Sequence, residues 1–390
     1  MTNVLMVLLD KSFPPDIRVE KEASSLLEGN YNVFLLTRRE KKQAKFETLN
    51  GIRIVRLNWP LNIQRRLVTI MSLPILSLRI VSLISKHNIR ILHVHDLSYA
   101  LLTAILGKIW HRKVIFDMHE NYTGMIEPLG RNPSGLLLMF YTRFTEIISC
   151  KFSAKIITAT PEIAERIISL GISATKIVVL SNVPDISLLN ELTKDSNKKR
   201  QLEGTFVISY VGGFSSHRGL DTLVNAMPLV MKKNPSTHLF LVGDGKMKPI
   251  LQRMVDRLKL NGYVTFTGWV PFDEAMEYVQ LSDLGIIPYH STAQTHSALP
   301  HKIFQYMFFK KPVLVSNVKL LKKMVETTKC GLVFPAGDHN QLAQRILEVA
   351  KNRRNLARLG ENGYKAVVTE YNWDREKTKL MKMYDEIVES

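Results

Sequence analysis

Cysteine is scarce in this sequence, and its scarcity excludes the small disulfide-rich proteins. Cys150 and Cys330 are the only cysteines among 390 residues, and they lie in different halves of the chain. A disulfide framework or a cysteine-based zinc site needs several cysteines at short spacings. Hydrophobic residues make up 45% of the chain, which is typical of soluble globular domains. We therefore expect a cytoplasmic protein held together by an apolar core.

Long apolar runs are also missing. The first residues, MTNVLMVLLD, have neither a basic segment before the apolar run nor a cleavage site of small residues, so they predict a core strand rather than a signal peptide. The nearest candidate for a membrane span, residues 67–85, is interrupted by Pro74 and Arg79. Two interpretations of this segment stay open: a helix packed on a sheet, or an interfacial helix flanked by Arg65 and Arg66.

Acidic residues are outnumbered. The chain has 53 Lys and Arg against 35 Asp and Glu, a formal net charge of +18, which would suit nucleic acid, an anionic membrane or a phosphorylated substrate. The basic residues are not interleaved with aromatic residues as a base-stacking surface requires, so we expect no nucleic acid partner. A run between residues 53 and 90 instead predicts a face that binds an anionic membrane peripherally, and its members are Arg53, Arg56, Arg65, Arg66, Arg79, Lys86 and Arg90.

Short β-branched segments alternate with longer amphipathic ones along most of the chain, which is typical of α/β proteins with parallel sheets. The predicted strands cover residues 4–10, 32–37, 52–57, 91–96, 113–119, 155–160, 177–182, 206–213, 238–243, 264–268, 284–289, 312–316 and 331–335. The length suits two domains, which we expect to be Rossmann-like and to face each other across a cleft. The predicted divisions are a first domain 1–185, a polar linker 186–204, a second domain 205–372 and a C-terminal segment 373–390 with a helix to about 388.

The dinucleotide fingerprint G-x-G-x-x-G is absent at the strand ends, which argues against a nicotinamide-dependent dehydrogenase. One strand end still favours an anion: FVISYVGGFSSHRGLDTLVNAM places Gly212 and Gly213 after a strand and Arg218 at the start of a helix. Glycine lets the backbone approach a phosphate, and a guanidinium offers a planar set of donors to its oxygens. The alternative is a solvated arginine in an ordinary loop.

The segment SALPHKIFQYM, residues 297–307, contains a further helix start at Pro300. His301 and Lys302 follow in its first turn, where a cation is disfavoured by the positive end of the helix dipole. A diphosphate shared with Arg218 would explain this placement. The alternative is that Lys302 extends into water.

Polar residues also gather at strand ends in the first half. His119 ends one strand and is either a site residue or a histidine bonded to backbone at the edge of the core. His93 and His95 alternate onto one face of the preceding strand, but no further convincing metal ligand accompanies them, so we predict no metal site. Asp16, Glu120 and Glu127 are candidate bases toward an acceptor hydroxyl, although Asp16 is equally suited to cap a helix that starts at Ile17.

The ordered segments VGGFSSHRGLDTLVNAM, LVGDG, VTFTGWVPFDEAMEYVQLSDLGIIPY, LPHKIFQYMFFKKPVLVSN and CGLVFPAGDHNQLAQRI resemble the donor-binding half of glycosyltransferase family 4, which comprises retaining enzymes of the GT-B fold. The first half is similar to the acceptor-binding half of the same family, in FPPDIRVEKEASSLLEGNYNVFLLT, HVHDLSYALLTAILGKIW, KVIFDMHEN and AKIITATPEIAERI. The resemblance covers nearly the whole chain. It implies an acceptor-binding first domain on which the C-terminal helix packs, and a second domain that binds a nucleotide-diphosphate sugar.

The resemblance also assigns residues. It implies that His119, Arg218 and Lys302 are catalytic, and that Asp16, Arg18 and Glu120 lie on the acceptor side. The implied donor-binding residues are Gly212, Gly213, Arg218, Gly243, Val270, Ser297, Lys302 and Gln305. Three of these depart from the family pattern: Gly213 replaces a basic residue, while Ser297 and Gln305 replace two glutamates.

An amide at Gln305 can still accept hydrogen bonds from a ribose, although less strongly than a carboxylate. From these features we expect a metal-independent retaining glycosyltransferase that uses a UDP- or GDP-sugar, no cofactor, and a lipid-linked, glycan or polysaccharide acceptor. Two alternatives remain: a sugar-nucleotide epimerase of the same fold, and a catalytically degenerate binding partner of another glycosyltransferase.

Overall fold

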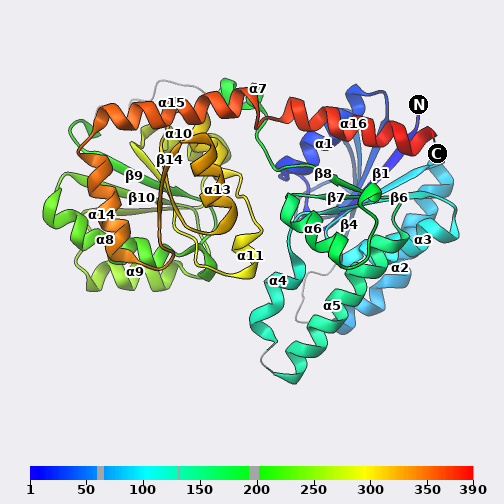
Figure 1. Cartoon of the computed structure of the whole chain (residues 1–390). Helices are drawn as coiled ribbons and strands as arrows, with labels where there is room; N and C mark the ends of the chain where they lie inside the picture. Colours follow the sequence, from blue (N-terminus) through cyan, green and yellow to red (C-terminus); the bar gives the residue numbers. More distant parts are fainter. Residues whose placement is uncertain (59–65, 131, 193–201, 390) are drawn as a thin grey trace. The chain divides into compact units, whose positions relative to one another are not determined.

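A computed structural model describes residues 1–58, 66–130, 132–192 and 202–389 (Figure 1). The chain folds into two compact units. Unit 1 comprises Met1–Ser181 with Asp374–Ser390, and unit 2 comprises Asn182–Trp373. Each unit is built around its own sheet, with helices on both faces, so each has the doubly wound α/β architecture of a Rossmann-like domain.

The sheet of unit 1 has the order β3-β4-β2-β1-β5-β6-β7-β8. Its strands are β1 (Asn3–Ser12), β2 (Asn32–Arg38), β3 (Phe46–Leu49), β4 (Ile52–Leu57), β5 (Ile91–His95), β6 (Lys113–Met118), β7 (Lys155–Thr158) and β8 (Ile177–Val179). Neighbouring strands are parallel except for β3, which pairs with β4 in the antiparallel sense. The sequence did not predict β3, because this short edge strand is largely exposed and lacks an apolar face.

The helices of unit 1 are α1 (Ile17–Glu28), α2 (Arg66–His87), α3 (Ala100–Ile109), α4 (Tyr122–Ile126), α5 (Pro133–Phe152), α6 (Pro161–Ser169) and α16 (Trp373–Glu389), with short 3-10 turns at η1 (Leu97–Tyr99), η2 (Glu127–Leu129) and η3 (Ala174–Lys176). Helix α2 covers most of the apolar segment 67–85. Its Leu76, Ile80 and Ile84 are fully buried in the core of unit 1, so α2 packs on the sheet.

The sheet of unit 2 has the order β11-β10-β9-β12-β13-β14 and is parallel throughout. Its strands are β9 (Phe206–Val211), β10 (Thr237–Val242), β11 (Val264–Gly268), β12 (Leu284–Ile287), β13 (Val313–Ser316) and β14 (Gly331–Phe334). Its helices are α7 (Ile186–Glu191), η5 (Ser216–Arg218), α8 (Leu220–Lys233), α9 (Lys248–Arg257), α10 (Phe272–Leu281), α11 (Ala293–His296), α12 (Lys302–Phe308), α13 (Lys319–Thr328), α14 (His339–Ala350) and α15 (Arg353–Thr369). Every strand predicted from the sequence is present in the two sheets.

The segment predicted as a linker, 186–204, is partly structured. Asp185 caps α7 by accepting a hydrogen bond from the backbone N–H of Ser187 at 2.9 Å. Leu189 of α7 is buried in one of the two core clusters of unit 2. The first residues of the predicted linker therefore belong to unit 2, while residues 193–201 lie outside the described part of the chain.

Helix α16 packs on unit 1. Its Leu380, Met383, Tyr384 and Ile387 are buried. Glu376 accepts a hydrogen bond from the backbone N–H of Ser181 at 2.9 Å. These contacts join the C-terminal residues to a core otherwise made from the first half of the chain.

The prediction of a basic face over residues 53–90 is wrong for one residue, Arg56. Arg56 is 1% exposed, and its guanidinium donates to the carbonyl of Phe13 and pairs with Glu47 at 2.6 Å. It therefore stabilises the first sheet from inside and cannot meet a membrane. Arg53, Arg79, Lys86 and Arg90 are exposed, whereas Arg65 lies outside the described residues. Among the helices that the structure describes, none is both long and apolar enough to cross a membrane.

Candidate functional site

Two glycine turns meet at the carboxyl ends of β9 and β10 in unit 2. Gly212 has a φ of +129° and Gly243 a φ of +135°, conformations that a residue with a side chain rarely adopts. A Cβ on Gly243 would lie 2.2 Å from the carbonyl oxygen of Gly212. The glycines are therefore required for the close approach of the two turns, and both are partly exposed.

Helix α8 begins at Leu220, after the first of these turns and the short 3-10 turn η5. Its N-cap, Gly219, has a φ of +65°, and a Cβ there would lie 1.8 Å from the carbonyl oxygen of Pro288. No side chain caps the helix N-terminus. The N-cap glycine supplies no acceptor, although the Asp221 carboxylate of the first turn accepts from the backbone N–H groups of Asp221 and Thr222. The positive end of the helix dipole still attracts an anion here.

Arg218 and Lys302 lie together beside this helix start. The guanidinium of Arg218 stacks on the ring of Tyr289 at 4.6 Å and donates a hydrogen bond to its hydroxyl. The ammonium of Lys302 lies 3.6 Å from the centre of the Tyr210 ring and 5.9 Å from that of Tyr289. Lys302 is only 9% exposed, so it does not extend into water.

The two cations have no acidic partner. Within the described residues, neither Arg218 nor Lys302 forms an ion pair with a carboxylate, and the Nε of Arg218 has no hydrogen-bond partner. Burial, together with the charge of Arg218, lowers the pKa of Lys302 well below its ordinary value. A buried ammonium without a counter-charge is costly, and an anion bound here would offset that cost.

The other predicted donor-binding residues differ in their burial and in their hydrogen-bond partners. Gly213 is exposed, and a Cβ at this position would meet open space. The hydroxyl of Ser297 donates to the carbonyl oxygens of Ala293 and Gln294, so it is directed back into α11. Gln305, on α12 one turn beyond Lys302, is buried with its amide nitrogen 3.1 Å from Nδ1 of His301. Val270 is partly buried against the core of unit 2.

Sequence reasoning missed three residues of this site. Tyr210 and Tyr289 hold the two cations, and His217 precedes Arg218 in the same loop. Burial and the nearby Arg218 lower the pKa of His217 to about 4, so this imidazole is neutral at pH 7. Tyr289 closely follows β12, and the rule that ligands bind beyond the carboxyl ends of parallel strands could have identified it.

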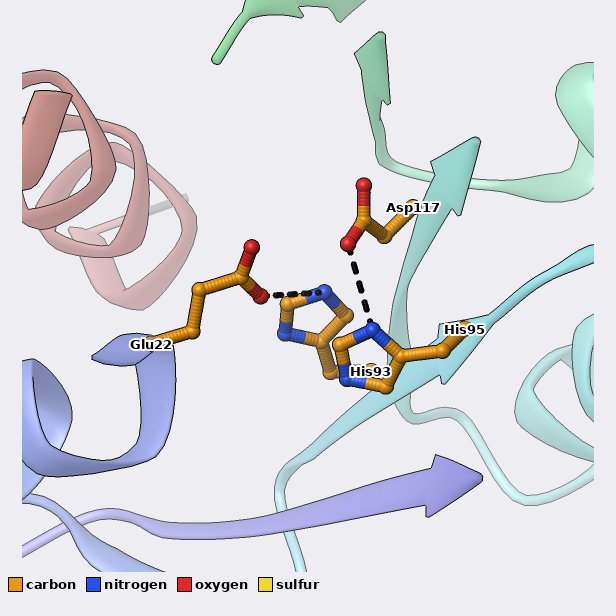
Figure 2. Close-up of side chains that lie close together, drawn as sticks. All are labelled: Glu22, His93, His95 and Asp117. Carbon is orange, nitrogen blue, oxygen red and sulfur yellow. Dashed lines mark hydrogen bonds and ion pairs between the residues drawn. The ribbon is translucent and has the colours of Figure 1, made fainter. Parts of the chain in front are cut away.

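A second cluster of polar residues is buried in unit 1 (Figure 2). The register of the sheet places His95 of β5 beside Asp117 of β6, and Nδ1 of His95 lies 3.1 Å from a carboxylate oxygen of Asp117. His93 stacks on His95 with ring centres 4.4 Å apart. Glu22 of α1 approaches Nε2 of His93 at 3.7 Å, and all four residues are fully buried.

Arg18 holds this cluster together, although the sequence predicted it on the acceptor side. Its guanidinium forms two hydrogen bonds to Asp117, at 2.8 and 3.0 Å, and pairs with Glu22 at 3.1 Å. It also donates to the carbonyl oxygen of Leu180. Because Arg18 is 6% exposed and its donors are engaged, the structure assigns it a structural position.

The four residues Glu22, His93, His95 and Asp117 could in principle hold a metal, since one ligand atom from each lies within 4.8 Å of the others. Nε2 of His95 has no hydrogen-bond partner among the described residues. However, ligands of a transition metal lie about 2.0–2.2 Å from the ion, which requires closer mutual spacing, and Arg18 already pairs with both carboxylates. An ion could enter only if the side chains contracted and Arg18 moved away, so the prediction of no metal site stays a prediction.

His119 lies at the edge of the same cluster. Its Nε2 is 2.8 Å from the Asp117 carboxylate, and its Nδ1 is 3.6 Å from Asp96. Burial alone would lower the pKa of His119, but these two carboxylates raise it to about 9. His119 is therefore a cation at neutral pH and is not the backbone-bonded histidine considered from the sequence.

The remaining acceptor-side candidates adjoin this edge. Asp16 caps α1 by accepting from the backbone N–H of Val19 at 3.1 Å, and it pairs with Lys11 at 3.2 Å. The capping role considered from the sequence is thus present. Glu120 follows His119 after the end of β6 and is half-buried. The structure therefore places the predicted catalytic residues in both units: His119 in unit 1, and Arg218 and Lys302 in unit 2.

Both halves of the chain match known sequence families. Residues 18–188 match the family described as "Glycosyltransferase Family 4", and residues 192–366 match "Glycosyl transferases group 1". Among curated proteins, the chain is 25% identical over 258 residues to the lipopolysaccharide core biosynthesis glycosyltransferase LpsE of Rhizobium meliloti, a match that covers 66% of this chain and 68% of LpsE. Two further curated relatives match over less than half of their own length.

Solved structures share the fold. Sucrose-phosphate synthase from Thermosynechococcus elongatus superposes with a TM-score of 0.81 at 18% identity, covering 100% of this chain and 99% of that one. HepE from Anabaena, solved in complex with UDP, superposes with a TM-score of 0.72 at 16% identity, covering 99% of this chain and 100% of that one. At these identities the likeness establishes the fold, which is that of the GT-B glycosyltransferases.

Proposed function

Because the chain belongs to glycosyltransferase family 4, with both of its halves matching glycosyltransferase sequences, we propose that it transfers a sugar from a nucleotide-diphosphate donor to an acceptor hydroxyl, with retention at the anomeric carbon and without a metal ion. Unit 2 is the donor-binding unit and unit 1 the acceptor-binding unit. The observation that carries the proposal is the pair Arg218 and Lys302, two cations without a carboxylate partner among the described residues.

The diphosphate of the donor supplies the missing counter-charge. Its oxygens accept hydrogen bonds from Arg218 and Lys302 near the positive end of the α8 dipole, while Gly212 and Gly243 leave room for the phosphates at the strand ends. As the bond between the anomeric carbon and the diphosphate oxygen breaks, negative charge grows on the leaving diphosphate. Fixed cations in a site with little water stabilise that charge strongly, which takes the place of a metal ion.

The acceptor hydroxyl attacks the anomeric carbon from the face that the diphosphate leaves, and its proton passes to a diphosphate oxygen. His119, as a cation, is proposed to stabilise the reacting groups from unit 1, with Asp16 and Glu120 on the acceptor side. The UDP bound by HepE supports a UDP-sugar as donor. The role of LpsE in lipopolysaccharide core synthesis supports a lipid-linked or glycan acceptor.

One observation favours a second candidate, a binding partner that no longer catalyses transfer. The Ser297 hydroxyl donates into its own helix, and Gln305 is neutral, so neither position offers the carboxylate that the family pattern contains. Such a protein would bind the nucleotide sugar without turning it over. Release of UDP measured with and without acceptor glycans distinguishes the two functions.

Arg218→Ala tests the donor site. A set of UDP- and GDP-sugars is screened for protection of the wild-type protein against thermal unfolding, and the sugar that protects best is titrated against the variant. We expect the affinity to fall by at least about tenfold, because the variant loses charge-assisted hydrogen bonds to phosphate. Arg253→Ala is the matched control, since Arg253 is an exposed arginine on α9. Unchanged protection of Arg218→Ala would remove the basis of the donor site.

A further inference from the structure

Helix α5 of unit 1 has its polar and apolar faces reversed relative to an ordinary surface helix. Its buried face carries polar side chains: Thr142, Thr145, Glu146 and Ser149. Its exposed face carries large apolar side chains with exposed fractions between 51% and 70%: Leu136, Leu137, Phe140, Tyr141 and Phe144. At 100° per residue these five fall on one continuous stripe of the helix.

The buried polar face is satisfied, which fixes the rotation of the helix. Glu146 forms two hydrogen bonds to Arg166 of α6, at 2.6 and 2.7 Å. Ser149 donates to the carbonyl oxygen of Thr145 at 2.7 Å. Turning the apolar stripe inward would break the buried ion pair with Arg166, a strongly unfavourable change. The exposure of the stripe is therefore built into the packing of unit 1.

Neighbouring segments extend the apolar character. Helices α3 and α4 both contact α5, and α4 and α5 lie side by side (Figure 1). Met125 of α4 and Leu129 of η2 are exposed, as are Ile109 of α3 and Trp110 just after it. Lys108 of α3 lies 4.5 Å from the ring of Phe152 at the end of α5. A single exposed apolar residue needs no explanation, but a stripe with such neighbours indicates an interaction surface.

The charged residues near the stripe indicate which class of partner it binds. On α5 the exposed charged side chains are Arg143 and Lys151, both basic, and Lys108 adds a third cation at the end of the helix. Glu127 of η2 is an exposed acid on the adjoining segment. Aromatic and aliphatic side chains bordered by Lys and Arg match the boundary between acyl chains and anionic headgroups, where the cations reach the phosphates.

We propose that the α5 stripe, residues Leu136, Leu137, Phe140, Tyr141 and Phe144, docks unit 1 on a bilayer that contains anionic phospholipid. Helix α5 lies in the interface rather than across the bilayer, because its opposite face is polar and packed on the protein. This moves the membrane-binding surface from the basic run at residues 53–90 to α5. The proposal does not depend on the donor site, although a lipid-linked acceptor would be presented at such a surface.

Co-sedimentation with vesicles tests the proposal. The full-length protein is mixed with phosphatidylcholine vesicles that contain about 30% phosphatidylglycerol, or with phosphatidylcholine alone. We expect the wild-type protein to sediment with the anionic vesicles. The double variant Leu137→Ser with Phe140→Ser should partition at least about tenfold more weakly, because two large apolar side chains no longer enter the acyl region. Arg143→Glu with Lys151→Glu should weaken binding to the anionic vesicles alone.

Leu229→Ser with Ile250→Ser provides the matched control, since both are partly exposed apolar residues of unit 2, and this variant should sediment like the wild type. Thermal unfolding of each variant verifies that the exposed substitutions leave the fold intact. Failure of the wild type to sediment, or equal sedimentation of the Leu137 and Phe140 variant, would overturn the proposal. So would a dimer in sedimentation velocity that this variant dissociates without any vesicle binding, because the stripe would then be an interface between two copies.

The outcome is separable from that of the proposed function. Vesicle binding is measured without nucleotide sugar, and protection by the nucleotide sugar is measured without vesicles. Loss of vesicle binding with retained protection would refute membrane docking while leaving the donor site in place. The reverse result would refute the donor site while leaving docking in place.

Discussion

Lys302 shows how the burial and the pKa of one residue depend on the residues around it. From the sequence it is a cation at a helix start, where it is disfavoured. In the structure its ammonium lies over the ring of Tyr210 and beside Gly212, and burial lowers its pKa. Contact with an aromatic face offsets part of the cost of burial. An anion bound beside Lys302 would relieve the remaining cost, which is the basis of the proposed donor site.

A substitution at Gly213 tests the proposed donor site at the scale of a single residue. The family pattern has a basic residue at this position, and the structure leaves open space where its Cβ would be. Gly213→Arg should therefore tighten binding of the nucleotide sugar by about three- to tenfold, because a third cation would reach the diphosphate. Isothermal titration calorimetry measures the change.

Gly262→Arg is the control for this gain. Gly262 also has open space at its Cβ position and lies in the turn before β11. The same charge added there should leave the affinity unchanged. If both variants bind the donor equally well, long-range attraction by net charge would explain the result, and Gly213 would not adjoin the phosphates.

At the scale of the element, α16 completes the buried network of unit 1. The hydroxyl of Tyr384 lies 2.8 Å from Nδ1 of His93. The hydroxyl of Tyr31 donates to a carboxylate oxygen of Asp385 at 3.1 Å. The last helix thus supplies a polar contact to the histidines that Glu22 and Asp117 surround, in addition to an apolar face. Helix α5 differs, since its buried side chains are polar apart from Cys150, and its large apolar stripe is exposed.

Leu380→Ala tests the contribution of α16 to stability. Leu380 is fully buried, so the truncation should lower the free energy of unfolding of unit 1 by about 2–5 kcal/mol. Urea unfolding combined with hydrogen exchange of β1 and β5 measures the loss. Val388→Ala, on the same helix at 44% exposure, should cost less than about 0.5 kcal/mol. Equal losses in the two variants would mean that α16 contributes little to the core.

At the scale of the whole molecule, the two units should respond to pH in opposite directions. In unit 1 the pKa of His119 is raised to about 9 by its carboxylate neighbours, and burial raises the pKa of Glu22 to about 7. Both shifts mean that the folded unit binds more protons than the unfolded chain. Stability from His119 is complete below its ordinary pKa of 6.5 and is lost as the pH rises through 9.

In unit 2 the sign is reversed, because the pKa of Lys302 and that of His217 are lowered by burial and nearby cations. At these two groups the folded unit binds fewer protons, so the stability that His217 contributes falls as the pH drops from 6.5 through the lowered pKa of about 4. The raised pKa of His290 acts in the opposite sense. The stability that Lys302 contributes increases as the pH rises toward the ordinary pKa of lysine.

Hydrogen exchange corrected for its intrinsic pH dependence checks this contrast. Between pH 6 and pH 9 we expect protection of β5 and β6 to fall by an amount on the order of 1–3 kcal/mol, while protection of β9 and β12 stays constant or rises. His119→Gln should flatten the response of unit 1 and leave that of unit 2 unchanged. A parallel loss of protection in both units would contradict the assignment.

The sequence by itself determined the strands, the two Rossmann-like units and the family, because hydrophobic periodicity and glycine turns are local signals that parallel sheets require. It also indicated Gly212, Arg218 and Lys302 as one group, since the carboxyl ends of parallel strands share an edge of the sheet. The short strand β3 escaped prediction because an exposed edge strand carries little periodic pattern.

Only the tertiary structure decided which charged side chains are buried and which are exposed. The sequence predicts Arg18 on the acceptor side and Arg56 on a basic face, yet both are buried by partners distant in sequence, Asp117 for the first and the Phe13 carbonyl for the second. Tyr289, Ser297 and the reversed faces of α5 likewise depend on which side of each element meets the core. Burial and the pairing of charges are set by contacts between distant segments. These contacts distinguish the paired cations Arg18 and Arg56 from Arg218 and Lys302, which form no ion pair within the described residues.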